Sequence, residues 1–141
     1  MSTLYSTKVT AAGGRAGTIK SDDGLLDLFL ALPKALGGKG DATNPEQLFA
    51  GGYAACFENA VIHVSRSMVD KVKDDDIVVV ATVGMEPNGQ GGFVLTVALD
   101  VTITGVDQET AEEIVAKAHA ACPYSNAVKG KIDVAITVAT N

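Results

Sequence analysis

Cysteine and histidine are scarce in this sequence, with only two of each among 141 residues. The two cysteines, Cys56 and Cys122, lie too far apart along the chain to form a Cys-x-x-Cys knuckle. The two histidines, His63 and His119, do not complete the short ligand spacings typical of a structural zinc centre, so the four residues make a poor zinc set. The sequence therefore predicts no metal site.

Clustered positive charge is also missing. The formal net charge is −6, and the longest run of like charge is Asp74-Asp75-Asp76. Nucleic acids and anionic membranes both bind grouped lysines and arginines, so we expect neither as a partner. No signal-peptide core and no stretch approaching the ~20 apolar residues of a membrane span occurs, which favours a cytoplasmic protein. Thiols are kept reduced in that compartment, where a cysteine pair is more often redox-active than structural.

No internal repeat or linker divides the chain, and its length fits one domain over residues 1–141. Alternating or β-branched residues predict strands over 5–11, 16–20, 26–32, 77–86, 93–104 and 132–139. Two helices are expected between them, one capped by Asn44 and the other capped by Asp107 and interrupted at Pro123. The order β-β-β-α-β-β-α-β, with most strands in hairpins, predicts an α+β fold on antiparallel sheets.

The first predicted helix, from Asn44 to about Val69, is apolar on nearly all sides. Such a helix belongs at the centre of a fold or of an interface. One small sheet offers it too little cover, so we expect a homodimer. Gly51-Gly52 lowers helix stability and predicts either a kink or very close packing at that point.

The residues around each cysteine leave its role open. Cys56 lies in the middle of this helix, where a small buried hydrophobic side chain is the more common interpretation. Burial raises the pKa of a thiol, and no lysine or arginine between Gln47 and Ser65 counters it, so any activating cation comes from elsewhere. Cys122 stands at a predicted turn before Pro123, free to approach another thiol. Disulfide formation would require Cα atoms roughly 4.4–6.8 Å apart, which the sequence does not decide.

Two long segments, 43–57 and 118–127, each contain one of the cysteines: Thr-Asn-Pro-Glu-Gln-Leu-Phe-Ala-Gly-Gly-Tyr-Ala-Ala-Cys-Phe and Ala-His-Ala-Ala-Cys-Pro-Tyr-Ser-Asn-Ala. They resemble the two signature stretches of the organic hydroperoxide resistance (Ohr) branch of the OsmC/Ohr family. The resemblance extends to the segment 13–17 and to the glycine-rich loop before Thr43, so it spans nearly the whole chain. The Cys-Pro-Tyr-Ser form at Cys122 favours the Ohr branch over its OsmC relatives.

This resemblance implies a thiol-dependent peroxidase that reduces alkyl and lipid hydroperoxides to alcohols. It implies an attacking role for Cys56 and a resolving role for Cys122. Arg15 matches the family's activating arginine, and Glu46 matches the carboxylate that holds it. The resemblance also implies an intertwined homodimer, with a lipoylated protein or dihydrolipoamide as reductant. No metal or bound organic cofactor is needed, because both electrons come from sulfur.

The spacing of Glu46 and Cys56 raises a geometric question. Ten residues separate them, or ~15 Å on a straight helix. Either the helix bends sharply at Gly51-Gly52, or a second copy of the chain donates Arg15 and Glu46. We favour the interface.

The other candidate residues have ordinary interpretations. His119 shares a helical face with Cys122, but a satisfied, partly exposed histidine is favoured over a general base. His63 lies about two turns from Cys56, too far for direct contact. An apolar approach to Cys56 would prefer bulky peroxides to hydrogen peroxide. Its candidate lining residues are Leu25, Phe29, Leu36, Phe49, Phe57 and Tyr124.

Three alternative functions stay open. One is an OsmC-type peroxidase with a broader peroxide range. Another is a redox switch or an apolar-ligand binding dimer, although the sequence shows no helix-turn-helix or basic stripe through which a switch could act on DNA. The last is a purely structural dimer in which Cys56 is inert.

Overall fold

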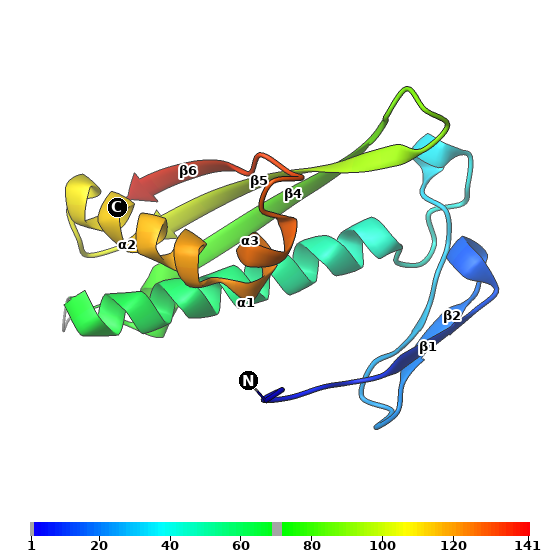
Figure 1. Cartoon of the computed structure of the whole chain (residues 1–141), viewed down its shortest axis with the longest axis horizontal. Coiled ribbons are helices and arrows are strands. Elements are labelled where there is room, and N and C mark those ends of the chain that lie inside the picture. The colour runs from blue at the N-terminus through cyan, green and yellow to red at the C-terminus, as the bar shows by residue number, and fades with distance from the viewer. Residues whose placement is uncertain (1, 69–71) are drawn as a thin grey trace. The chain divides into compact units, whose positions relative to one another are not determined.

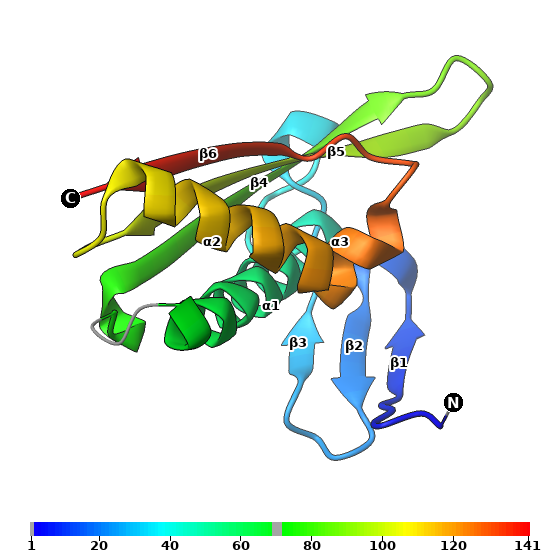
Figure 2. The same cartoon turned by 60° about the vertical axis from the view of Figure 1, so that its left-hand side comes forward.

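The computed structural model describes residues 2–68 and 72–141, and the chain forms two compact units, Met1–Leu48 and Phe49–Asn141. The first unit contains an antiparallel three-stranded sheet, whose strands lie side by side in Figure 2. Its elements are β1 (Val9–Ala12), η1 (Gly14–Ala16), β2 (Thr18–Ser21), β3 (Asp27–Phe29) and η2 (Lys34–Leu36). The three predicted strands are therefore present, each shorter than expected. The prediction of one domain over residues 1–141 stays a prediction.

The first unit has almost no core. Among its described residues Leu30 is the one buried apolar side chain, whereas Phe29 is 77% exposed. The alternating leucines of segment 26–32 predicted a half-buried strand, and their burial follows this pattern in part: Leu30 is buried, Leu26 and Leu32 are partly buried, and Leu28 is 37% exposed. The strand itself is shorter than predicted and covers only Asp27–Phe29.

The second unit is built on a mixed sheet, β4-β5-β6, seen in Figure 1. Its strands are β4 (Ile77–Pro87), β5 (Phe93–Ile103) and β6 (Ala135–Thr140). The predicted hairpin is confirmed, because β4 and β5 pair antiparallel from Ile77↔Ile103 to Pro87↔Phe93. The pair β5–β6 is parallel, in contrast to the antiparallel sheets that we expected. The chain returns to this edge through helices, and such a crossover permits parallel pairing.

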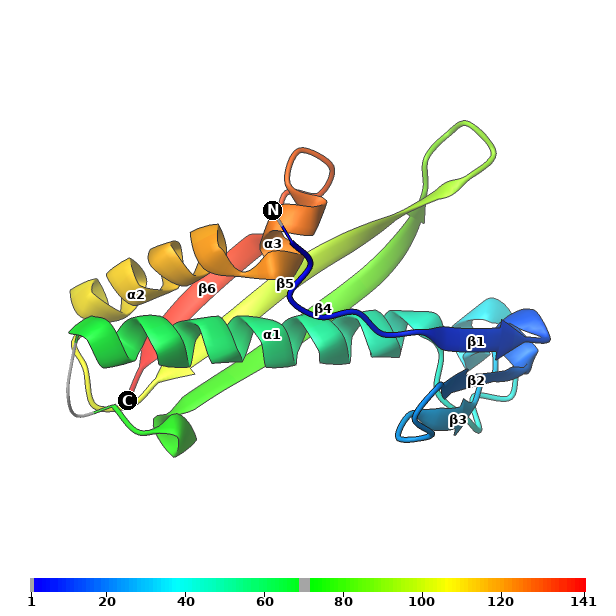
Figure 3. The ribbon, with the colours of Figure 1, turned by 60° about the horizontal axis from the view of Figure 1, so that its bottom comes forward.

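Helix α1 (Pro45–Met68) begins with the predicted cap, since the Gln47 N–H donates to Asn44 Oδ1 over 2.9 Å. The helix is continuous past Gly51-Gly52 and runs straight in Figure 3, so the predicted alternative of a kink is wrong. Val69, our expected end, lies outside the described residues. None of the helices among the described residues is long and apolar enough to cross a membrane.

Two further helices lie between β5 and β6. Helix α2 (Gln108–Ala121) has the predicted Asp107 cap, whose side chain accepts from the Thr110 N–H over 2.7 Å. The residues after Pro123 form a short helix, α3 (Pro123–Val128), instead of the predicted turn. Proline has a backbone φ suited to the first helical position and no N–H to satisfy there. Pro123 therefore ends one helix and begins the next.

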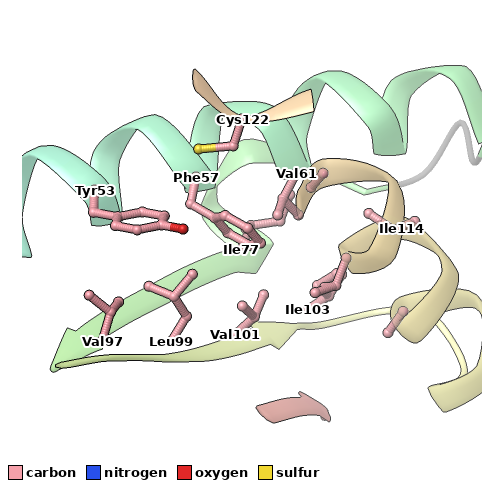
Figure 4. Packing of buried hydrophobic residues seen from close by; sticks show 13 residues of the cluster. Tyr53, Phe57, Val61, Ile77, Val97, Leu99, Val101, Ile103, Ile114 and Cys122 are labelled. Carbon is pink, nitrogen blue, oxygen red and sulfur yellow. The ribbon is translucent and has the colours of Figure 1, made fainter. Parts of the chain in front are cut away.

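The core of the second unit fills the space between the helices and one face of the sheet, as Figure 4 shows. From α1, Tyr53, Phe57 and Val61 point inward at a spacing of four residues, which is one face of a helix. From β5 every second residue faces them: Val97, Leu99, Val101 and Ile103. Burying each of these side chains stabilises the fold by roughly 1.5–3 kcal/mol.

Candidate functional site

The two cysteines lie next to each other in the second unit, with their Sγ atoms 3.9 Å apart. Cys56 is half-buried on α1, Cys122 is fully buried, and both are free thiols. A disulfide has an S–S bond of about 2 Å, so bond formation needs the two sulfurs to approach by a small further movement. The fold thus brings together the two thiols that the sequence placed on separate elements.

Cys122 is held firmly by the backbone on both sides. Its N–H donates to the Ala118 carbonyl over 2.8 Å, and its own carbonyl accepts from the Asn126 N–H over 3.0 Å. Cys122 is the C-cap residue of α2 and also the N-cap residue of α3. Cys122 therefore lies at a bend between two helices instead of the predicted turn, and its freedom to move stays a prediction.

The environment of Cys56 favours the neutral thiol. Burial raises its pKa, the adjacent Cys122 raises it further, and a hydrogen bond from the Tyr124 backbone lowers it. A thiol in such a setting is a weak nucleophile until a positive charge stabilises the thiolate. Cys56 therefore needs an activating cation beyond these neighbours, as its sequence context predicted.

Tyr124 packs closely against α1 at Gly52. Any side chain at Gly52 would collide with the Tyr124 ring and hydroxyl. The Tyr124 ring also contacts Phe49 and Tyr53, with ring centroids 6.0 Å and 5.4 Å away. Of the two interpretations of Gly51-Gly52, close packing is therefore confirmed, and Gly52 is the residue that requires it.

A hydroxyl network, which sequence reasoning missed, lies beside the thiols. The Tyr53 and Ser125 hydroxyls share a hydrogen bond of 2.7 Å, and Ser125 Oγ lies 2.9 Å from His119 Nδ1. His119 is thus a half-buried histidine with a partner, the interpretation that its sequence position favoured. The spacing of His119 and Ser125, three residues on either side of Cys122, is the one local signal that pointed to this network.

Arg15 and Glu46 form a two-point ion pair in the first unit. Arg15 Nη1 lies 2.6 Å from Glu46 Oε1, and Nη2 lies 2.9 Å from Oε2. Arg15 follows Gly13 and Gly14, whose φ values of 83° and 63° are conformations that side chains disfavour. Glu46 is in the first turn of α1. The hydrogen bonds between Arg15 and the Glu46 carboxylate raise the pKa of Arg15 and fix the orientation of its guanidinium.

The predicted lining residues differ in how exposed they are and come from both units. Phe57 is fully buried in the core and cannot line an approach open to solvent, so that prediction is wrong. Phe49 and Tyr124 are partly buried beside the thiols. Leu25, Phe29 and Leu36 belong to the first unit and are exposed in the single chain. His63 is exposed on α1, and its ordinary interpretation stands.

Comparison with known proteins gives a consistent result. A model of the family described as OsmC-like protein matches residues 38–137. The organic hydroperoxide resistance protein of Xanthomonas axonopodis pv. citri is 46% identical over 140 residues, covering 96% of this chain and 95% of that protein.

Solved structures agree over the full length. An organic hydroperoxide resistance protein from Elizabethkingia anophelis is 46% identical, with a TM-score of 0.94 and all of both chains covered. One from Vibrio cholerae, solved with captopril in one of its active sites, is 54% identical, with a TM-score of 0.91; the match covers 100% of this chain and 94% of that one.

Proposed function

Because this chain belongs to the OsmC/Ohr family, within its organic hydroperoxide resistance branch, we propose that it is a cysteine-based peroxidase reducing organic hydroperoxides to alcohols. The observation that carries the proposal is the 3.9 Å separation of the Cys56 and Cys122 sulfurs. Two reduced thiols at this distance can supply the two electrons that cleavage of one O–O bond requires.

The reaction has two steps. The Cys56 thiolate attacks the outer oxygen of the hydroperoxide, the O–O bond breaks, and the alkoxide leaves and takes up a proton to become the alcohol. Cys56 is then a sulfenic acid. The Cys122 thiolate attacks the Cys56 sulfur, the S–O bond breaks, and hydroxide leaves and takes up the proton that Cys122 released, giving water. The product is the Cys56–Cys122 disulfide, formed before irreversible overoxidation.

Arg15 is the proposed source of the missing positive charge. A guanidinium beside Cys56 would lower its pKa and could donate hydrogen bonds to the peroxide oxygens. Glu46 would act through Arg15, since the two-point ion pair fixes the plane of the guanidinium. In the single chain both side chains of the ion pair are partly exposed, Arg15 by 39% and Glu46 by 18%.

A homodimer is proposed to assemble the site. Helix α1 is unbroken, so Glu46 and Cys56, ten positions apart, are separated by about 15 Å along its axis. This distance prevents Glu46 from reaching Cys56 along the same helix, so a second copy of the chain would donate Arg15 and Glu46 to the site. Exposed apolar side chains suited to such an interface occur in both units: Val9, Leu25, Leu28, Phe29, Leu36, Val78, Val80, Phe93 and Val94.

The reductant and the location rest on the family alone. We propose that a lipoyl-type dithiol, on a lipoylated protein or as dihydrolipoamide, reduces the disulfide, and that the protein works in the cytoplasm. The chemistry needs no metal and no bound organic cofactor, since sulfur provides both electrons.

Steady-state turnover tests the proposed function. The chain is supplied with dihydrolipoamide and either cumene hydroperoxide or hydrogen peroxide, and alcohol and residual peroxide are measured. We expect a higher kcat/KM with the bulky peroxide. A preference for hydrogen peroxide would favour the OsmC-type alternative, and absence of turnover with both would favour the switch or structural alternatives.

Complementation between two inactive variants tests the dimer. Cys56→Ser and Arg15→Ala are co-expressed with different tags, and the mixed dimer carries one site with both residues intact. Random pairing should restore about a quarter of the wild-type sites, because half of the dimers are mixed. The control pairs Cys56→Ser with a Cys56→Ser/Arg15→Ala double variant and should stay inactive. An inactive mixed dimer in the first pairing would place Arg15 in the same chain as its cysteine.

A further inference from the structure

The bend that contains Cys122 is closed by a side-chain contact. His119 is in the last turn of α2 and Ser125 is in the first turn of α3, each three residues from the cysteine. Their contact, 2.9 Å between Nδ1 and Oγ, joins the two helices across the bend. The angle between α2 and α3 fixes the direction of the Cys122 side chain, so this contact bears directly on the position of its sulfur.

Ser125 also ties the bend to α1. Its hydroxyl shares the 2.7 Å hydrogen bond with Tyr53, which lies three residues before Cys56 and so on the same side of the helix. The two cysteines are thus also connected through these contacts. One turn of α1 joins Cys56 to Tyr53, the hydrogen bond joins Tyr53 to Ser125, and the start of α3 joins Ser125 to Cys122. These links therefore bear on the distance between the two sulfurs.

Ser125 is suited to this place because a hydroxyl can donate one hydrogen bond and accept others. Ser125 and Tyr53 are both buried, and each has a partner. Alanine at position 125 would leave the Tyr53 hydroxyl and one nitrogen of His119 without this partner. Both groups would then shift toward other partners, and the bend would lose its link to α1.

We propose that Ser125, through Tyr53 and His119, is a positioning residue that holds Cys122 within reach of Cys56 for disulfide closure. The inference deepens the proposed function and rests on it, because closure is the second step of the peroxidase reaction. It concerns that step alone, since the hydrogen bonds described for Ser125 Oγ join it to Tyr53 and His119 and not to Cys56.

Closure can be measured without any peroxide. The reduced protein reacts with one equivalent of Ellman's reagent, and the more exposed Cys56 thiolate displaces the first thionitrobenzoate and keeps the second in a mixed disulfide. The Cys122 thiolate then attacks the Cys56 sulfur, the mixed disulfide breaks, and the second thionitrobenzoate leaves as the Cys56–Cys122 disulfide forms. The first release reports access to Cys56, and the second reports closure.

We expect Ser125→Ala and Tyr53→Phe to slow the second release by about ten- to a hundredfold, the range caused by a small misplacement of reacting atoms. The first release should stay within about twofold of wild type, since neither change touches Cys56 itself. Tyr53→Phe keeps the aromatic ring in the core, so the pair of variants separates lost positioning from lost folding. Ser65→Ala is the matched control, because Ser65 is also buried and, among the described residues, its hydroxyl donates to the Ile62 carbonyl of its own helix.

Three outcomes would overturn the inference: a second release at the wild-type rate in both variants, an equal slowing of both releases, or the same slowing in Ser65→Ala. Failure of the proposed function is a different result. A wild-type chain that closes rapidly with Ellman's reagent but leaves cumene hydroperoxide intact would remove the peroxidase and keep the positioning role.

Discussion

The two units of this chain differ in how far each can stabilise itself. The second, Phe49–Asn141, has α1 and α2 on a three-stranded sheet with a continuous buried core. The first, Met1–Leu48, has a three-stranded sheet and one buried apolar side chain, Leu30. A unit of this size with so small a core usually needs a partner. The cysteines belong to the second unit, which has its own buried core, whereas the Arg15–Glu46 pair belongs to the first unit, which has almost none.

The proposed site is divided between the two units. Cys56 and Cys122 are already in place within one chain, but burial leaves the Cys56 thiol with a raised pKa. The proposed source of positive charge, Arg15, belongs to the other unit. In the proposed dimer, assembly would therefore also activate the thiol, and a separated chain would react slowly.

The largest expected effect is on the thiol chemistry of the second unit. Cys56→Ser should abolish turnover, because the attacking sulfur is gone. Cys122→Ser should allow one reduction of cumene hydroperoxide and then stall, with overoxidation of Cys56 visible by mass spectrometry. Normal turnover of Cys122→Ser with dihydrolipoamide would show that Cys122 is not the resolving thiol.

A pair of phenylalanine variants tests the contrast in core packing. Phe57→Ala, in the second unit, should lower the free energy of unfolding by about 3–5 kcal/mol, because it leaves a cavity beside β5. Phe29→Ala, in the first unit, should instead weaken dimerisation with little effect on unfolding of the separated chain. Urea denaturation and sedimentation measure the two. Equal losses of unfolding free energy in both variants would contradict the contrast.

Removal of the arginine tests the division of the site. Arg15→Ala should slow the reaction with cumene hydroperoxide by about a hundredfold or more, the usual effect of losing one preorganised donor. Because a guanidinium lowers the pKa of a neighbouring thiol and burial raises it, the pH midpoint of Cys56 alkylation by iodoacetamide should move upward. Circular dichroism should show an unchanged fold. A midpoint equal to that of wild type would remove Arg15 from the site.

The smallest expected effect concerns the start of α1. Asn44→Ala removes the acceptor for the Gln47 N–H and should lower the free energy of unfolding by about 1 kcal/mol. Asn44→Asp keeps an acceptor and serves as its control. A strong loss of peroxidase activity in Asn44→Ala, measured where the variant is still folded, would indicate that the cap also positions Glu46.

Local chemistry made part of this structure predictable. The caps Asn44 and Asp107 and the hairpin between β4 and β5 depend on neighbouring residues, and all three were found as expected. Pro123 was ambiguous, since proline both stops a helix and starts one, and α3 was missed. The parallel pairing of β6 was missed because it depends on how the chain returns after α2.

Long-range contacts limited the prediction of the site. The resemblance nominated the two cysteines and the Arg15–Glu46 pair, and the structure brings the members of each pair into contact. The Tyr53–Ser125 hydrogen bond joins residues 72 positions apart, and no spacing in the sequence reports such a contact. Phe57 was assigned to a substrate approach because its aromatic character does not distinguish a core from a pocket.

A single-turnover measurement shows whether Cys56 and Cys122 act together as a peroxidase. The fully reduced chain is mixed with one equivalent of cumene hydroperoxide, and free thiols, cumyl alcohol and intact mass are followed over time. We expect rapid loss of both thiols, one alcohol per chain, and a monomer mass lower by two hydrogens, as for a Cys56–Cys122 disulfide. Persistence of two free thiols beside unreacted peroxide would rule out the proposed peroxidase.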